Sequence, residues 1–279
     1  MRLSAAAIGL LVALPAAHCW GSLGHITIAY VATNFVQDDT ATYFKELLRN
    51  DTVDYLAGQF TKNFHFIDAK DAPPTNCHVD FDRDCKKDGC VVSSLDNYTR
   101  QLLDSELMPW RRSQAAKFVI HFVGDISQPL HAENVAQGGN GIHHRRADAG
   151  GIHRKPYPAA HAWAANLTAA IQNGKYSEQS KTWADGMSLD DPIQTAMLWA
   201  RESNAIVCGT ACRADNVVKI KVLPDGPSAI VGKELAGGYF ERAAPVVELQ
   251  VARAGYRLAQ WLDLIVERIH APSPAENEL

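Results

Sequence analysis

The chain lacks the features that divide a protein into separately folded parts. No linker rich in Pro, Gly and Ser, no long block of like charge and no internal repeat interrupts its 279 residues. One large domain is therefore expected over residues 20–279, with a long loop over residues 136–160, which are rich in Gly, His and Pro. The apolar run from Ala5 to Leu14 is too short to span a bilayer, so it is not a membrane anchor.

Positive charge is also scarce. The 27 Lys and Arg residues are outnumbered by 31 Asp and Glu residues, which gives a net charge of −4. No global basic field therefore attracts nucleic acid, and any charge that binds phosphate has to be local. Bound metal ions are one source of such local charge.

Residues 1–19 have the pattern of a secretory signal. Arg2 supplies the positive charge, the apolar run follows, and Ala17 and Cys19 are the small residues at positions −3 and −1. Cleavage after Cys19 would leave 260 residues with a net charge of −5, because Arg2 is the only charged residue removed. The signal predicts a secreted, extracellular protein.

A mature chain that starts at Trp20 would offer an uncommon metal ligand. The α-amine and carbonyl of Trp20 lie in one short segment with the imidazole of His25. An amine, a carbonyl and an imidazole together can chelate a transition metal. This pattern indicates a metal site at the mature N-terminus.

The cysteines indicate disulfides, because cysteines of secreted proteins are in an oxidising environment. A zinc-finger interpretation of their spacing is weak. Five remain after cleavage: Cys77, Cys85, Cys90, Cys208 and Cys212. The spacing of Cys85 and Cys90 suits a small closed loop. One of the first three is expected to pair with Cys208 or Cys212, which leaves an odd thiol.

Three possible N-glycosylation sequons follow from the same secreted context. They begin at Asn50, Asn97 and Asn166. A used sequon has to be accessible, so these asparagines are expected at the surface.

Apolar residues recur at helical spacing in several segments, and the alternation typical of strands is absent. Ser113 can cap one helix, and Asp191 with Pro192 opens another. The predicted helices cover residues 23–36, 113–127, 192–207 and 245–269. The predicted fold class is all-α, as a single helical domain.

A cluster of histidine and aspartate is the strongest chemical signal. His121 and Asp125 are four residues apart on one helical face, and His131 follows after a turn that contains Pro129. Zinc binds neutral imidazole and carboxylate, and a rigid helix fixes their separation. The alternative is that His121 and Asp125 form an ordinary pair on the helix and that His131 caps a turn.

Further histidines favour the metal interpretation. His65 lies beside an aromatic residue, and His144 and Asp148 repeat the four-residue spacing. Eleven histidines are too many to be ligands together. Those assigned to the surface or to loops are His78, His153 and His161, and His18 is in the signal.

With these motifs the sequence resembles the secreted, zinc-dependent, single-strand-specific endonucleases of fungi and plants, the nuclease S-one/P-one family. The similarity runs from Trp20 to about Arg268. Its motifs are Trp-Gly-x-x-Gly-His at residues 20–25, His-Phe-Ile-Asp-Ala at 65–69, Asp-Phe-Asp-Arg-Asp-Cys at 80–85, His-x-x-Gly-Asp-Ile-x-Gln-Pro-Leu-His at 121–131, Gly-Gly-Asn-Gly at 138–141 and Ala-Gly-Tyr-Arg-Leu at 254–258. The resemblance implies a helical fold like that of bacterial phospholipase C. It also implies three zinc ions that activate water for attack on phosphodiester phosphorus, with 5′-phosphate products.

The resemblance implies a role for each matching position. The three ligand sets are Trp20, His25 and Asp125 for one zinc, His65, His121 and Asp125 for a second, and His131 with the candidates His144 and Asp148 for the third. Asp125 and Asn140 are the expected catalytic residues, with Asn140 as a donor near the scissile phosphate. Phe66 and Asp68 resemble a pocket in which an aromatic ring stacks on an unpaired base and a carboxylate accepts from its edge. The family disulfides correspond to Cys77–Cys208 and Cys85–Cys90.

One departure from the family pattern concerns catalysis directly. The family carries a Trp-Ala-Asp block before the position of His65, and its aspartate is both a zinc ligand and the general base. Only residues 57–64 stand in this gap, and none of them is acidic. Asp54 is the nearest upstream carboxylate, but it belongs to the segment before the missing block.

Two further departures lie later in the chain. A second block is shortened after Ile142, where His144 and Asp148 keep the ligand spacing without the family's tryptophan. An insertion near residues 209–221 adds Cys212.

Two functions of different class therefore compete. The first is a secreted, monomeric endonuclease that hydrolyses single-stranded DNA and RNA without membrane contact, at a reduced rate. The second is a secreted zinc-binding glycoprotein of the same fold without catalytic activity. A zinc phospholipase shares the scaffold, but Phe66 and Asp68 favour a nucleobase over a lipid headgroup.

Overall fold

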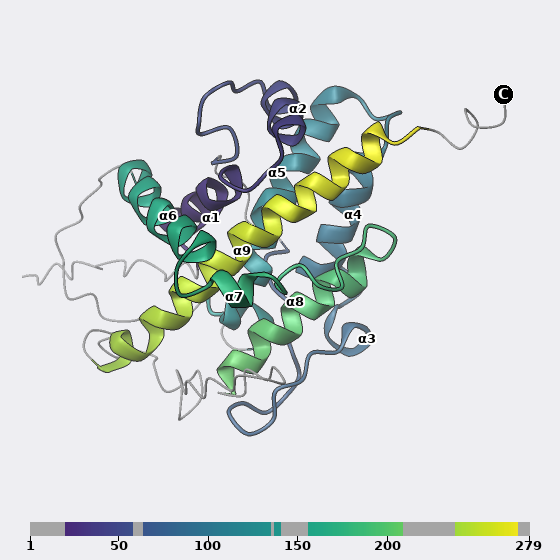
Figure 1. Ribbon diagram of the computed structural model, residues 1–279. Coiled ribbons are helices and arrows are strands. Elements are labelled where there is room, and N and C mark those ends of the chain that lie inside the picture. Colours follow the sequence, from purple (N-terminus) through teal and green to yellow (C-terminus); the bar gives the residue numbers. More distant parts are fainter. Residues whose placement is uncertain (1–19, 58–63, 135–136, 141–155, 209–237, 273–279) are drawn as a thin grey trace, which may run out of the picture.

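The computed structural model describes residues 20–57, 64–134, 137–140, 156–208 and 238–272 (Figure 1). Within these ranges the chain forms helices and no strand, which confirms the predicted all-α fold. The elements are α1 (Ser22–Thr33), α2 (Asp38–Leu48), α3 (Phe81–Asp84), α4 (Val91–Leu103), α5 (Pro109–Ile126), the 3-10 helix η1 (Pro129–Ala132), α6 (Tyr157–Gln172), α7 (Ser177–Ser180), α8 (Pro192–Val207) and α9 (Gly238–His270). None of the described helices is both long enough and apolar enough to cross a membrane.

Helix α9 is the central element of the core. Its apolar stripe recurs at helical spacing, and Leu258, Trp261 and Ile265 are fully buried. Helices α1, α4, α5 and α6 all contact it. Figure 1 shows α9 crossing the molecule, with α1 and α6 along one side and α4 and α8 on the other.

A glycine brings α1 unusually close to α9. A Cβ at Gly255 would lie 2.5 Å from Cβ of Val31 and 3.0 Å from the carbonyl oxygen of Ile28. Any larger residue would push the two helices apart. This crossing fixes α1, whose first turn carries His25.

The predicted helix boundaries hold for α8 and differ for the other three helices. The Asp191 side chain caps α8 by accepting from Gln194 N at 2.9 Å. Helix α1 begins at Ser22 and ends at Thr33, three residues before the predicted end. Helix α5 begins at Pro109 and not at Ser113, because proline at the first helical position needs no backbone donor. Helix α9 begins at Gly238 and continues through Pro245.

Other helices were not predicted from periodicity. Helix α6 begins at Tyr157, inside the expected loop of residues 136–160. Helices α2 and α4 pack an amphipathic face onto the core without a strong capping signal in the sequence.

Both family-type disulfides are present. Cys77–Cys208 ties the segment before α3 to the end of α8, and Cys85–Cys90 closes the loop between α3 and α4. The predicted insertion with Cys212 and the signal at residues 1–19 lie outside the described residues.

Candidate metal centre

Helix α5 places a carboxylate at the centre of the site. Asp125 lies one turn after His121, and the distance between His121 Nε2 and Asp125 Oδ2 is 3.3 Å. The Asp125 side chain is 2% exposed. A buried carboxylate is stable only with partners around it.

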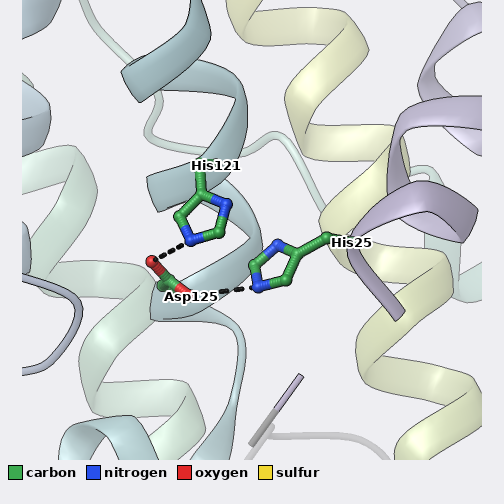
Figure 2. Close-up of side chains that lie close together, drawn as sticks. All are labelled: His25, His121 and Asp125. Atoms are coloured by element: carbon green, nitrogen blue, oxygen red, sulfur yellow. Dashed lines mark ion pairs between the residues drawn. The ribbon is translucent and has the colours of Figure 1, made fainter. Parts of the chain in front are cut away.

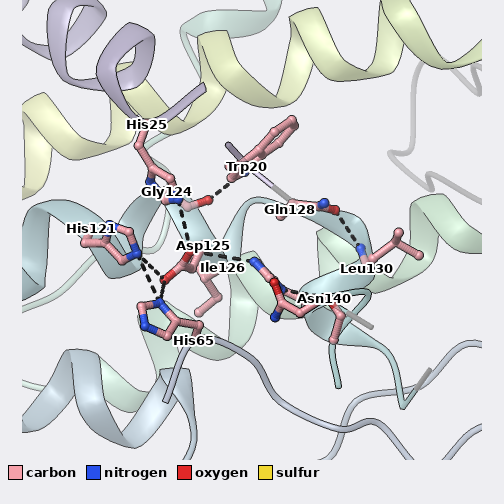
Figure 3. Close-up of polar contacts among 12 residues, drawn as sticks. Trp20, His25, His65, His121, Gly124, Asp125, Ile126, Gln128, Leu130 and Asn140 are labelled. Carbon is pink, nitrogen blue, oxygen red and sulfur yellow. Dashed lines mark hydrogen bonds and ion pairs between the residues drawn. The ribbon is translucent and has the colours of Figure 1, made fainter. Parts of the chain in front are cut away.

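Three more imidazoles converge on the same carboxylate from separate segments. Figure 3 shows His25 and His65 pointing at Asp125. His25 Nε2 from α1 lies 3.3 Å from Asp125 Oδ1, and His65 Nδ1 lies 2.7 Å from Oδ2. His131 Nε2 from η1 lies 3.7 Å from Oδ1. Each carboxylate oxygen therefore faces two histidines.

The imidazoles are also close to one another. The rings of His25 and His121 stack with centroids 4.0 Å apart, and both point at Asp125 in Figure 2. His121 Nε2 lies 3.0 Å from His65 Nδ1. One ligand atom from each of His25, His121 and Asp125 lies within 4.8 Å of the others, which is a spacing that one metal ion can bridge.

The close approach of His25 to α5 explains why glycine stands at position 124 of the His-x-x-Gly-Asp motif. A Cβ at this position would lie 2.9 Å from His25 Nδ1, so only glycine lets the imidazole lie against α5. The Gly124 carbonyl accepts from the indole Nε1 of Trp20 at 2.9 Å. This hydrogen bond holds Trp20 against Gly124, the residue that directly precedes Asp125 in α5.

His131 joins the metal centre to the predicted base pocket. Its Nδ1 lies 2.8 Å from the Gly138 carbonyl, and its ring stacks on Phe66 with centroids 6.5 Å apart. Gly138 has φ +62, and a Cβ there would lie 2.5 Å from Cβ of Phe66. The turn after His131 therefore closes against Phe66 only because glycine stands in it.

The other two predicted substrate residues lie near this turn. Asn140 follows Gly138 by two residues, and its amide donates to the Gln137 carbonyl at 2.9 Å. Asp68 accepts from Lys86 Nζ at 2.8 Å. A base edge that binds Asp68 has to compete with this surface ion pair.

Three buried polar residues that support the site gave no signal in the sequence. Ser203 Oγ of α8 donates to the Ile126 carbonyl at 2.7 Å, and Gln250 Nε2 of α9 donates to the Ser127 carbonyl at 2.7 Å. Asn204 Nδ2 donates to the Ala132 carbonyl at 2.9 Å. Together they fix the backbone between Asp125 and His131. Each is a single polar residue on a largely apolar helix face, and only the folded structure shows its partner.

Burial and neighbouring charge set the protonation of the centre. Burial lowers the pKa of His121 to about 3, and the neighbouring imidazoles add to this effect. Burial likewise lowers the pKa of His131 to about 4. For Asp125, burial raises the pKa, but His121 and the hydrogen bonds from His25 and His65 outweigh it, so the pKa lies well below its usual range. The centre therefore presents the neutral imidazoles of His121 and His131 beside the ionised carboxylate of Asp125.

This donor set fits a transition metal. Neutral imidazole nitrogens and a carboxylate are ligands that zinc prefers. A neutral His131 uses its one N–H at Nδ1 to donate to the Gly138 carbonyl, so the lone pair of its Nε2 faces Asp125 Oδ1 at 3.7 Å, and a metal ion would be attracted to both atoms.

A second acidic cluster does not fit a metal in the same way. Asp71, Cys77 and Glu133 lie close together, but the disulfide to Cys208 removes the thiolate that a metal would need. Burial, and then the charge of Asp71 and a hydrogen bond to it, raise the pKa of Glu133 to about 9. Glu133 and Asp71 therefore share a proton, and Asn204 donates to both side chains.

Several predicted residues lie apart from the centre or outside the described residues. The hydroxyl of Tyr30 donates to Asp54, which places Asp54 against α1. Asn97 and Asn166 are exposed on α4 and α6, whereas Asn50 is half-buried. The histidines His78 and His161 are exposed. His144, Asp148 and His153 lie outside the described residues.

Comparison with known proteins agrees with this geometry. The family model described as S1/P1 Nuclease matches residues 20–267. The chain belongs to the S1/P1 nuclease family. It is 40% identical over 280 residues to Nuclease S1 from Aspergillus oryzae (strain ATCC 42149 / RIB 40), with 89% of this chain and 92% of that protein covered. It is 35% identical over 274 residues to Nuclease P1 from Penicillium citrinum, with 88% of this chain and 97% of that protein covered. Endonuclease 3 from Arabidopsis thaliana is 29% identical over 283 residues, with 88% and 89% covered.

Membership of the S1/P1 nuclease family confirms the predicted enzyme class, a single-strand-specific endonuclease and hydrolase. Nucleases of this family are metal-dependent, and His25, His121 and Asp125 form a candidate metal-binding group here. The family also implies a nucleic acid substrate.

Proposed function

We propose that this S1/P1 nuclease is a secreted, zinc-dependent endonuclease that hydrolyses single-stranded DNA and RNA to products with 5′-phosphates. It acts as one nuclease domain from Trp20 onward and as a monomer. The observation that carries the proposal is the convergence of four imidazoles from four segments on the buried carboxylate of Asp125. No structural role requires four histidines around one carboxylate.

The chain's own residues would hold zinc in three sets. The Trp20 amine and carbonyl, with His25 and Asp125, hold one ion, and His65, His121 and Asp125 hold a second. His131 belongs to the third set, and His144 and Asp148 are its proposed partners. Bound zinc supplies a hydroxide near neutral pH and neutralises charge on the phosphate.

Substrate is bound beside these ligands. Phe66 is half-buried and stacks on His131, so its accessible face can take an unpaired base. A base paired in a duplex has both faces covered, and this explains a preference for single strands. Asn140, in the turn next to Gly138, donates to the scissile phosphate.

The alternative is an impaired or inactive zinc-binding glycoprotein of the same fold, and one observation favours it. Asp54 bonds to the Tyr30 hydroxyl, which argues against Asp54 as a replacement for the family's missing general base. General-base assistance contributes about a hundred- to ten-thousand-fold in rate. Hydrolysis that relies on the remaining residues is therefore slow.

Metal counting and a restored block together test the proposal. The zinc content of protein secreted with a free Trp20 amine is measured alongside its hydrolysis of single-stranded DNA. A variant with a Trp-Ala-Asp block inserted between Leu56 and His65 is then compared with it. Two zinc ions and slow hydrolysis, with zinc content and rate both raised by the insertion, or three zinc ions and slow hydrolysis with the rate alone raised, support the nuclease. Zinc without hydrolysis in either protein supports the inactive glycoprotein, and the absence of zinc refutes both.

A further inference from the structure

A cavity of about 280 Å³ lies beside the metal centre, and none of its walls is a proposed zinc ligand. The turn after α2 contributes Asp54, α5 contributes Lys117 and Ile120, and α6 contributes Tyr157. Ile120 directly precedes His121, and Lys117 lies one helical turn earlier, about 6 Å along the helix axis. The cavity is therefore adjacent to the metal centre.

The cavity and the Phe66 pocket adjoin different ligands of the centre, because Ile120 in the cavity wall directly precedes His121 whereas Phe66 stacks on His131. Along α5 the order is Lys117, His121 and Asp125, and Phe66 lies beyond Asp125 against His131. A phosphodiester joins two nucleotides, so an enzyme that cuts within a strand has to accommodate a nucleotide on each side of the phosphate. Phe66 accounts for only one of these two positions.

The walls of the cavity combine an acceptor, a cation and an apolar surface. A carboxylate has about four acceptor positions, so Asp54 can accept from a ligand as well as from Tyr30. Burial, and then this bond to Asp54, raise the pKa of Tyr30, so Tyr30 keeps its proton and acts as the donor to Asp54. Lys117, which lies four residues before His121 on α5, is the cation in the cavity wall, and Leu56 provides buried apolar surface.

The size of the cavity selects one ring system. At about 30 Å³ for each water molecule, it holds about nine waters, and a nucleobase has about eight to eleven non-hydrogen atoms. The walls therefore suit one base, with its phosphate outside toward Lys117.

We propose that this cavity binds the base of the nucleotide across the scissile phosphate from the one at Phe66. Asp54 accepts from an exocyclic amino group of that base, and Lys117 contacts the backbone phosphate. The carbonyl oxygens of thymine and uracil would face the Asp54 carboxylate, so adenine and cytosine bind better here. This inference rests on the proposed nuclease function, because it assumes a nucleic acid strand at the metal centre.

Binding of dinucleotides to two cavity variants tests the proposal. Asp54→Asn keeps an oxygen for Tyr30 and replaces one acceptor with a donor, and Lys117→Met keeps the apolar stem without the charge. Lys45→Met is the matched control, because Lys45 lies over the ring of Tyr55 and is not part of the cavity wall. Calorimetry on the zinc-loaded, deglycosylated protein measures Kd for phosphorothioate-linked thymidine–adenosine dinucleotides in both orders, for the thymidine–thymidine dinucleotide and for thymidine monophosphate.

We expect Asp54→Asn to weaken binding of the adenosine dinucleotide about tenfold and to remove its advantage over thymidine–thymidine. Lys117→Met weakens binding of every dinucleotide about tenfold, and Lys45→Met changes none by more than about twofold. Monophosphate binding stays the same throughout. Lys117→Met alone carries the test if Asp54→Asn does not fold, because Lys117 is half-exposed on α5.

Unchanged dinucleotide affinity in both cavity variants overturns the proposal. Hydrolysis of long single-stranded DNA by the parent protein is measured separately, so that the two conclusions remain distinguishable. Hydrolysis without any effect of the cavity variants refutes the cavity and leaves the nuclease in place. Dinucleotide binding that depends on Asp54 and Lys117 in a protein without hydrolysis supports the cavity and refutes the nuclease.

Discussion

Gly124→Ala is expected to weaken zinc binding without weakening the fold. The added Cβ would lie 2.9 Å from His25 Nδ1, whereas ordinary contacts of a Cβ begin at 3.4 Å. The imidazole therefore has to move by about 0.5 Å, and zinc ligands tolerate about 0.2 Å. Losing the group that orients a ligand typically costs about 10- to 100-fold in metal affinity, and we expect a loss of this size at the site of His25.

The stability of the metal-free protein is expected to change little. Gly124 lies within α5, where alanine favours the helix over glycine by about 0.5–1 kcal/mol. This gain offsets part of the cost of moving His25, so thermal unfolding in EDTA should stay within a few degrees of the parent protein. Competition with a chromogenic chelator measures the zinc affinity of both proteins.

Gly238→Ala is the control, because its Cβ would meet only the flexible side chain of Arg242 at 3.4 Å. This variant should keep the parent affinity for zinc. If Gly124→Ala also keeps it, the contact between His25 and α5 does not position a zinc ligand, and the assignment of His25 to the centre is wrong.

Three further perturbations have defined outcomes. Asp125→Asn removes the charge that faces four imidazoles, so zinc content by atomic absorption should fall while helicity by circular dichroism is retained; full zinc content would contradict the proposed role of Asp125. A short tag before Trp20 acylates its amine and should remove one zinc ion per chain relative to the untagged protein, and equal zinc content and nuclease rate in both would refute this ligand. Glu133→Gln should flatten the pH dependence of the free energy of unfolding. Burial and Asp71 raise the pKa of Glu133 to about 9, so between about pH 4.5 and pH 9 the folded parent keeps a proton that the unfolded chain has lost. The contribution of Glu133 to stability is therefore greatest below about pH 4.5 and falls by up to about 1.4 kcal/mol per pH unit as the pH rises toward 9. Urea unfolding at pH 6 and pH 8.5 measures this slope, and an equal slope in both proteins would count against a shared proton.

Local spacing predicted those parts of the site that a single helix holds. His121 and Asp125 could be paired from sequence because four residues make one helical turn. Spacing alone could not bring His25, His65 and His131 to the same carboxylate, because their convergence depends on how α1, η1 and the segment before α3 pack. The resemblance to a known family supplied that information, together with both disulfides.

The residues that support the site were beyond any local pattern. Asp71 and Glu133 are far apart in the chain, and their shared proton exists only after folding buries Glu133 beside Asp71. The side chains of Ser203, Asn204 and Gln250 donate to backbone carbonyls. No local sequence pattern predicts which carbonyl each of these side chains contacts. The predicted start of α5 was wrong for a simpler reason. Proline is favoured at the first position of a helix, and α5 begins at Pro109 rather than after a cap at Ser113.

The close crossing of α1 and α9 at Gly255 also determines when the nuclease can first become active. Val31 and Gly255 are separated by about 220 residues, and ribosomes add about 5–20 residues per second, so α1 waits about 11 to 45 s for the helix that supports it. Until then His25 and Trp20 have no fixed place beside Asp125. The nascent chain therefore spends most of its synthesis without an assembled metal centre.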